Sequence, residues 1–375
     1  MTLNITHVAP VFLPVNEHLT YGGTERVINS LRKKQKKLGL EPKILASSDS
    51  SDEHLVPTVH SIGVEAIYSS TLSPGEARRT TLSRLEHVSM VLAYARKHPE
   101  ELLHIHDEDL VPFSNLVPGG VVVTLHSPVE DFWPKNLGEI NQQCRNLIAI
   151  SRKQREIYET RGFPIRQVIP HGIEVEDYAM GNTKQRYLLS LSAIARHKGQ
   201  ETAILVAQAI GTDLVIAGNI ADSKYFDQEI KRGIQFDLSS AEDKLEAYLA
   251  LPSDRPKVVY VGPVNDTQKK PLYAQAAAYL MPIQWEEPFG LVVVEALASG
   301  TPVVAFNRGA MPEIIKDGET GYLVNTVDEM VNAVRNIPNI RPEACRRDAE
   351  LRFSSETMAR NYIRLYEDIL RERAP

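Results

Sequence analysis

The stretch from residue 279 to residue 302 reads YLMPIQWEEPFGLVVVEALASGTP. It begins with a short apolar run, 279–281, that is typical of a buried strand. Pro288 and Gly290 then mark a turn. Residues 291–299 are predicted to form a helix, which a glycine and a nearby proline end. A strand, a turn and a helix in this order form the repeating unit of a parallel α/β sheet.

Similar units continue in both directions along the chain. In the first half, the predicted strands are 5–9, 43–46, 102–106, 121–125, 147–150 and 167–169, and the predicted helices are 24–38 and 81–97. In the second half, the predicted strands are 187–191, 214–217, 258–261, 279–281 and 303–305. The predicted helices there are 201–210, 241–249, 267–277, 291–299 and 356–373. Each half can therefore form its own doubly wound sheet.

The chain of 375 residues is too long for one ordinary core and suits two domains. Proline, glycine and acidic residues gather at 170–177, so we place the join and a hinge there. We expect one Rossmann-like domain at 1–170, completed by helix 356–373, and a second at 171–355. Ligands of parallel sheets bind at the carboxyl ends of the strands. Two facing domains would therefore hold the active site in the cleft between them.

The bulk composition excludes several classes of protein. The net charge of −6 and the isoelectric point of about 6.0 argue against nucleic acid as a partner. The two cysteines, Cys144 and Cys345, have no metal-ligand spacing, so a reducing cytoplasm is expected. The first residues lack a signal-peptide pattern, and no apolar run approaches the roughly 20 residues that span a bilayer. Any membrane contact is therefore expected to be peripheral, at the inner membrane face.

Two glutamates in the opening stretch are candidate ligand-binding residues. Glu287 lies in the predicted loop, and Glu295 lies about one turn inside the predicted helix. The first backbone N–H groups of the helix are free, and together with the helix dipole they favour an anion. A buried carboxylate beside them can accept hydrogen bonds from ribose hydroxyls. Two glutamates eight apart occur by chance in many proteins, but the surrounding EPFG and SGTP do not.

This segment resembles the Glu-x7-Glu signature of the retaining glycosyltransferases of family 4, which have the GT-B fold. The pattern continues as FNRGAMPE at 306–313 and DGETGYLV at 317–324, and the resemblance spans nearly the whole chain. It implies an acceptor-side domain at 1–170 and a donor-binding domain at 171–355. It places Glu287 near the donor hexose and Glu295 on the ribose. The backbone amides of three residues are expected to approach the donor: Phe289, Gly290 and Leu291.

The resemblance also identifies phosphate-binding residues in both domains. Gly22 and Gly23 follow the first strand and open a helix, where the family's glycine loop faces the diphosphate; a plain turn is the alternative. Lys198 matches the family's lysine and is expected to neutralise the leaving phosphate. Ala193 stands where the family usually has an arginine. Arg196 either replaces that arginine or is a solvated loop residue.

Residues 104–109 read HIHDED. His104 and His106 are two apart and so lie on one face of a strand, and Asp-x-Asp at 107–109 can hold a divalent cation, so the run invites comparison with a metal site. The resemblance instead places Asp107 in the acceptor cleft, and it implies that no metal is required, since GT-B enzymes generally need none. His126 follows the strand at 121–125 and is expected near the donor hexose and the acceptor cleft. The alternative is a packed histidine at the end of a strand.

The run at 32–37 reads RKKQKK, beginning at Arg32 and ending at Lys37. Its simplest interpretation is a solvated helix face. The alternative is peripheral docking on anionic lipid, which is common in the family.

The resemblance implies transfer of a hexose from a UDP-sugar such as UDP-glucose to a small-molecule, glycan or lipid-linked acceptor. The catalytic residues are expected to be Lys198, His126 and Glu287, and no cofactor is expected. Because no residue is convincing as a nucleophile, we expect the acceptor to attack on the face that the nucleotide leaves, with the protein positioning the reactants. Two alternatives stay open: a GT-B nucleotide-sugar epimerase, and a donor-binding subunit that has lost catalysis, which Ala193 alone favours.

Overall fold

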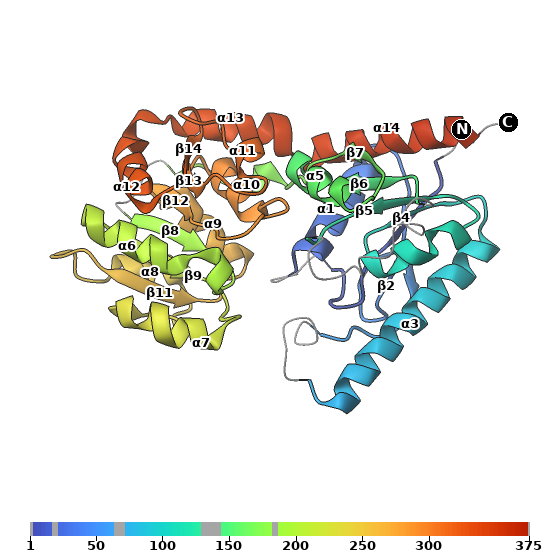
Figure 1. The fold of residues 1–375 in the computed structure, drawn as a ribbon, viewed down its shortest axis with the longest axis horizontal. Helices are drawn as coiled ribbons and strands as arrows, with labels where there is room; N and C mark the ends of the chain where they lie inside the picture. The colour runs from blue at the N-terminus through green and yellow to red at the C-terminus, as the bar shows by residue number, and fades with distance from the viewer. Residues whose placement is uncertain (1–2, 17–21, 64–71, 129–143, 182–186, 374–375) are drawn as a thin grey trace. The chain divides into compact units, whose positions relative to one another are not determined.

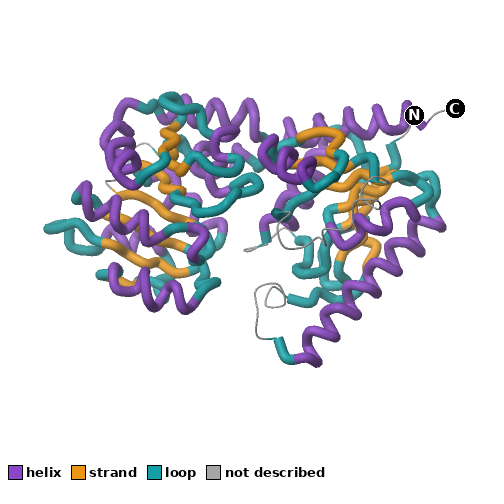
Figure 2. Tube along the Cα trace, viewed as in Figure 1, coloured by secondary structure: helices purple, strands orange, loops and turns teal. Residues whose placement is uncertain are grey.

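The structure is a computed structural model that describes residues 3–16, 22–63, 72–128, 144–181 and 187–373. Tyr21, next to the predicted glycine loop, lies outside these residues. The chain divides into two compact units, which are considered separately below (Figure 1). The first comprises Met1–Gly172 with Ser355–Pro375, and the second comprises Ile173–Ser354. Helices and strands alternate along the chain in both units (Figure 2).

The first unit contains a parallel sheet of seven strands in the order β3-β2-β1-β4-β5-β6-β7. Its strands are β1 (Ile5–Val8), β2 (Lys43–Ala46), β3 (Leu55–Pro57), β4 (Leu102–Ile105), β5 (Val121–Thr124), β6 (Leu147–Ala149) and β7 (Ile165–Val168). Its helices are α1 (Gly23–Lys37), α3 (Pro74–Lys97), the 3-10 helix η1 (Glu108–Leu116), α5 (Arg152–Thr160) and α14 (Ser355–Arg373). The strand order reverses between β1 and β4, which is where such sheets bind ligands.

The two faces of this sheet differ in chemistry. On one face Val8, Ile105 and Val123 join an apolar cluster that includes residues of α3. On the other face α1 and α14 pack together. They cover two buried histidines, His7 of β1 and His104 of β4, which occupy paired positions in the strands. The C-terminal helix α14 thus completes the first unit.

The second unit contains a parallel sheet in the order β10-β11-β9-β8-β12-β13-β14. Its strands are β8 (Tyr187–Leu191), β9 (Asp213–Ala217), β10 (Phe236–Asp237), β11 (Val258–Gly262), β12 (Ala278–Met281), β13 (Val303–Phe306) and β14 (Gly321–Val324). Its helices include α6 (Gln200–Ile210), α7 (Ser223–Tyr225), α8 (Lys244–Leu249), α9 (Asp266–Gln275), α10 (Leu291–Ala298), α11 (Met311–Ile314), α12 (Val327–Asn336) and α13 (Pro342–Phe353). Here the order reverses between β8 and β12.

Two doubly wound Rossmann-like sheets confirm the predicted fold class. The sequence analysis missed β3, β10 and β14, which are edge strands and therefore carry little of the apolar signal of a buried strand. Helix α3 begins earlier than predicted, because Ser73 is its N-cap and forms a capping box with Glu76, and Pro74 is its first residue. Among the described residues, every helix is too short or too polar to cross a bilayer.

Candidate functional site

Two loops meet at the point where the strand order of the second sheet reverses. One follows β8 and contains the 3-10 turn η3 (Arg196–Lys198), and the other follows β12. The backbone N–H of Gln284 donates to the carbonyl of His197 at 2.7 Å. Gly199 has a φ of +72°, and a Cβ there would lie 2.0 Å from the carbonyl oxygen of Pro282. Only glycine therefore allows this approach of the two loops.

The approach brings together Lys198 and Glu287, two of the predicted catalytic residues. The ammonium Nζ of Lys198 lies 2.6 Å from Oε2 of Glu287, and both side chains are largely buried. The indole N–H of Trp285 donates to the same oxygen at 3.0 Å. The ammonium group also lies 4.8 Å from the centre of the Trp285 ring, a cation–π distance. These contacts hold the amino group of the lysine in one place.

The predicted helix after Glu287 is α10, and it begins where the glycine predicts. Gly290 is its N-cap, with a φ of +100°, a conformation that favours glycine. Phe289 is buried and packs edge-to-face on Phe353. The backbone of Phe289, Gly290 and Leu291 thus lies at the positive end of the helix dipole, beside Glu287. The start of a helix favours an anion, so binding of the donor phosphates here stays a prediction.

Glu295 is buried within α10 and forms an ion pair that the sequence analysis missed. Its Oε1 lies 2.8 Å from Nζ of Lys269, on α9, and only 1% of the glutamate side chain is exposed. Lys269 also lies 2.9 Å from Asp266. In the sequence, Lys269 is only a lysine one turn after a helix N-cap. Many exposed helices have a lysine at that position, so the sequence does not single it out.

Arg196 points away from this group. Its guanidinium faces Glu229 at 3.9 Å and lies over the ring of Tyr225, and its side chain is 60% exposed. This geometry favours the solvated-loop interpretation over a diphosphate ligand. The carbonyl of Ala193 accepts a hydrogen bond from Gln200.

In the first unit, Gly22 and Gly23 start α1 as predicted. Gly22 is the N-cap with a φ of +104°, and a Cβ there would lie 2.6 Å from a carboxylate oxygen of Glu25. Glu25 is buried in the first turn of α1, and burial raises its pKa to about 7. The glycine therefore leaves room for a buried carboxyl group that the sequence analysis did not single out.

His126 and Asp107 lie at the ends of neighbouring strands. Glu108, next to Asp107 in the chain, accepts hydrogen bonds from the backbone N–H groups of His126 and Ser127 at 2.6 and 2.8 Å. Asp107 is buried and caps η1 by accepting from the N–H of Asp109. Burial and the nearby Asp109 raise the pKa of Asp107 to about 7. Glu108 is thus a positioning residue that the sequence analysis missed.

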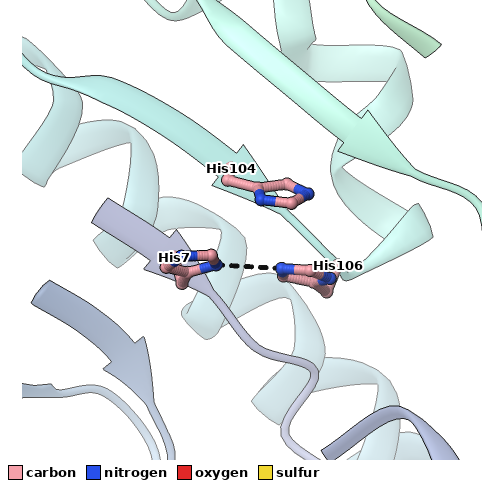
Figure 3. Close-up of side chains that lie close together, drawn as sticks. All are labelled: His7, His104 and His106. Carbon is pink, nitrogen blue, oxygen red and sulfur yellow. Dashed lines mark hydrogen bonds between the residues drawn. The ribbon is translucent and has the colours of Figure 1, made fainter. Parts of the chain in front are cut away.

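Three histidines of this unit offer ligand atoms within 4.8 Å of one another: His7, His104 and His106 (Figure 3). All six of their ring nitrogens already have hydrogen-bond partners. Asp109, at the other end of the Asp-x-Asp pattern, forms a bidentate pair with Arg84. A metal would have to replace these hydrogen bonds.

The basic run is less exposed than a solvated face or a lipid-docking patch requires. Arg32 is buried, with a guanidinium nitrogen 2.5 Å from Asp52, and Lys34 is buried as well. Lys36 pairs with Glu53 at 2.7 Å. Within the run only Lys33 and Lys37 are exposed, so the interpretation of Arg32–Lys37 as a solvated helix face holds for these two lysines alone.

Comparison with known proteins identifies the family of both units. The family described as Glycosyltransferase Family 4 matches residues 21–177, and the family described as Glycosyl transferases group 1 matches residues 179–349. The chain belongs to the family 4 type of glycosyltransferases. A crystal structure of Anabaena HepE with UDP and glucose covers 98% of this chain and 100% of its own, with a TM-score of 0.70 and 16% identity. That likeness supports the GT-B fold.

Two curated relatives of this glycosyltransferase chain match parts of it. An uncharacterised protein of the cps region of Klebsiella pneumoniae is 37% identical over 30% of the chain and 33% of its own length. The D-inositol 3-phosphate glycosyltransferase of Acidothermus cellulolyticus is 25% identical over 61% of the chain and 53% of its own length. The chain thus spans between a third and about half of the length of these relatives.

Proposed function

We propose that this chain is a metal-independent hexosyltransferase. It moves a hexose from a UDP-sugar such as UDP-glucose to a small-molecule, glycan or lipid-linked acceptor, with retention of configuration. The observation that carries the proposal is the Lys198–Glu287 pair, held by Trp285 where the strand order of the second sheet reverses. The presence of UDP and glucose in the HepE crystal structure supports this choice of donor.

The proposed step needs no protein nucleophile. The bond from C1 of the hexose to the β-phosphate oxygen breaks, and a bond from C1 to the acceptor oxygen forms on the same face. The acceptor proton passes to the released phosphate oxygen. Lys198 has three N–H donors, of which Glu287 accepts one, so others can stabilise the charge on the leaving UDP.

Other residues would bind the donor. The start of α10 would face the diphosphate, and Glu295 would accept from the ribose hydroxyls. Gly22 and Gly23 open α1, which would offer the diphosphate a second helix N-terminus. Peripheral membrane contact stays a prediction, and of the basic run only the exposed Lys33 and Lys37 support it.

A nucleotide-release assay with a panel of UDP- and GDP-sugars tests the proposal. We expect UDP release that depends on an acceptor and that EDTA does not change. Conversion of one UDP-sugar into another without release would instead establish an epimerase. Tight nucleotide binding without turnover of any donor would instead indicate a donor-binding subunit. Glu295→Ala should weaken UDP binding if the ribose assignment is right.

A further inference from the structure

Three buried histidines form a hydrogen-bonded row across one face of the first sheet. His7 lies on β1, and its Nδ1 is 3.0 Å from Nε2 of His106, just after β4 (Figure 3). Nδ1 of His106 is in turn 2.9 Å from Nε2 of His126, just after β5. We call His7, His106 and His126 the histidine relay. It leads from the buried middle of the sheet to the strand end where His126 lies.

Gln35 of α1 sets the direction of the relay. Its side-chain oxygen lies 2.8 Å from Nε2 of His7, and its side-chain nitrogen donates to the hydroxyl of Tyr366 at 3.1 Å. An amide oxygen can only accept. His7 therefore carries its hydrogen on Nε2, which leaves a lone pair on Nδ1 to accept from His106.

The same arrangement repeats along the relay, because all three rings are neutral. Burial lowers the pKa of His7 and of His126 to about 3 and holds that of His106 well below its usual value. A neutral imidazole has one donor and one acceptor. His106 donates from Nε2 to His7, so its Nδ1 must accept from Nε2 of His126. Nδ1 of His126 consequently carries a lone pair.

A second branch is directed by the same orientation of Gln35. The hydroxyl of Tyr366, which accepts from Gln35, lies 2.6 Å from Nδ1 of His104 and can donate to it. Nε2 of His104 then donates to the hydroxyl of Thr124 at 2.8 Å. Turning the Gln35 amide over would reverse every hydrogen in both branches and would place a hydrogen on Nδ1 of His126.

The outer end of the relay is a nitrogen whose lone pair accepts no hydrogen bond from the part of the chain that the structure describes. Nδ1 of His126 is buried and has no hydrogen-bond partner among the described residues, whereas the other ring nitrogens of the relay each have one. The ring stacks on that of His171, with centroids 5.0 Å apart and an interplanar angle of 21°. Glu108 holds the backbone N–H of His126. The ring is thus held on several sides around one unsatisfied lone pair.

We propose that Gln35, His7 and His106 are positioning residues that hold His126 as a hydrogen-bond acceptor for one hydroxyl of the donor hexose. The inference rests on the proposed function, which supplies a donor hexose, and on the resemblance that places His126 near that hexose. A phosphate at neutral pH only accepts, so the lone pair of a neutral ring disfavours it and selects a hydroxyl that donates. Recognition of the sugar is thereby separated from the charged recognition of the nucleotide.

The ring states can be measured without any turnover. In the full chain with 15N-labelled histidine rings, long-range proton–nitrogen spectra at neutral pH should show hydrogen on Nε2 and a lone pair on Nδ1 for the whole relay. Adding UDP-glucose should shift the Nδ1 signal of His126. Hydrogen on Nδ1 of His126 in the free protein, or binding of UDP-glucose without that shift, would overturn the inference. If UDP-glucose does not bind, the proposed donor fails, and recognition of its hexose by His126 fails with it, while the ring states are still measured.

Kinetics separate positioning from a purely structural role. UDP-glucose analogues with fluorine in place of the 3-, 4- or 6-hydroxyl cannot donate at that position. One of them should lose about tenfold in kcat/KM with the natural chain. In His106→Leu and Gln35→Met, UDP-glucose itself should lose about tenfold, and the penalty of that analogue should nearly vanish.

A control is Thr6→Val, which removes a buried hydroxyl on β1 that donates to Glu101 and lies on the opposite face of the strand from His7. It should leave the ratio between UDP-glucose and its analogue unchanged. An equal loss for all donors in His106→Leu and Gln35→Met, with the analogue penalty intact, would show that the relay only supports the fold and would overturn the inference.

Discussion

The two sheets hold buried polar side chains where their strand orders reverse, but they stabilise them in opposite ways. In the second unit each buried carboxylate faces a lysine: Glu287 with Lys198, and Glu295 with Lys269. In the first unit the relay histidines are neutral, and burial raises the pKa of Glu25 to about 7. The difference suits charged ligand groups at the second sheet and uncharged hydroxyl groups at the first.

The largest effect is expected from breaking a charge pair of the second unit. Lys269→Met leaves the buried carboxylate of Glu295 without its lysine, which should lower the free energy of unfolding by about 3–5 kcal/mol. Urea unfolding followed by circular dichroism measures this loss. Adding Glu295→Leu to the variant should recover most of it, since that charge is then gone as well.

Lys244→Met is a matched control, because buried Lys244 donates to backbone carbonyls of Leu238 and Ser239 instead of a carboxylate. Its loss should be smaller, since no buried charge remains. Equal losses in both variants would mean that the charge pairing of Glu295 is not what stabilises it.

The next largest effect concerns catalysis. Lys198→Ala removes the cation expected at the leaving phosphate, so kcat should fall by about 10²–10³ while the dissociation constant for UDP changes little. Steady-state kinetics and calorimetry measure the two quantities. Lys231→Ala, which removes an exposed lysine paired with Asp227, should change neither. A normal kcat in Lys198→Ala would show that Lys198 does not stabilise the charge on the leaving phosphate.

The buried carboxyl group of Glu25 in the first unit should affect the pH dependence of stability. Glu25 has an ordinary pKa of 4.5 and a folded pKa of about 7, so the folded state binds more protons between these values. The contribution of Glu25 to the free energy of unfolding should therefore fall by about 3 kcal/mol as the pH rises from about 4.5 to about 7. The buried histidines, whose pKa values are lowered, contribute in the opposite direction below pH 6.5. Glu25→Gln should remove this part of the slope in urea unfolding.

Asp107, whose pKa is also raised to about 7, should keep a slope of its own in that variant. The exposed Glu86→Gln serves as the control and should leave the slope as it is. A slope that is identical in Glu25→Gln and the natural chain would show that Glu25 is not buried in its neutral form.

The sequence predicted the candidate site of the second unit better than that of the first. The ranges 43–46 and 187–191 match β2 and β8, because buried strands are continuous apolar runs. Glu287 and Lys198 were identified by motif, and the structure brings them into contact. Such motifs are read locally, within one loop and its helix.

The missed interactions depend on strand pairing and helix packing, which no local pattern reveals. Lys269 and Glu295 are 26 positions apart in the chain, and they meet because α9 packs against α10. The spacing of His104 and His106 predicted that they share a face of a strand. Their link to His7 requires the register of β1 against β4, about a hundred residues away.

The smallest effect tests whether the charged site extends to Arg196. Its guanidinium is exposed and lies at 3.9 Å from Glu229, so the pair is worth at most about 1 kcal/mol. Arg196→Ala should change kcat/KM for UDP-glucose by less than about threefold and stability by under about 1 kcal/mol. Lys224→Ala, on the nearby helix α7, controls for the loss of a surface cation. A hundredfold loss of kcat/KM in Arg196→Ala, but not in Lys224→Ala, would mean that Arg196 turns toward the diphosphate when the donor binds. Arg196 would then replace the arginine that the family usually has at the position of Ala193.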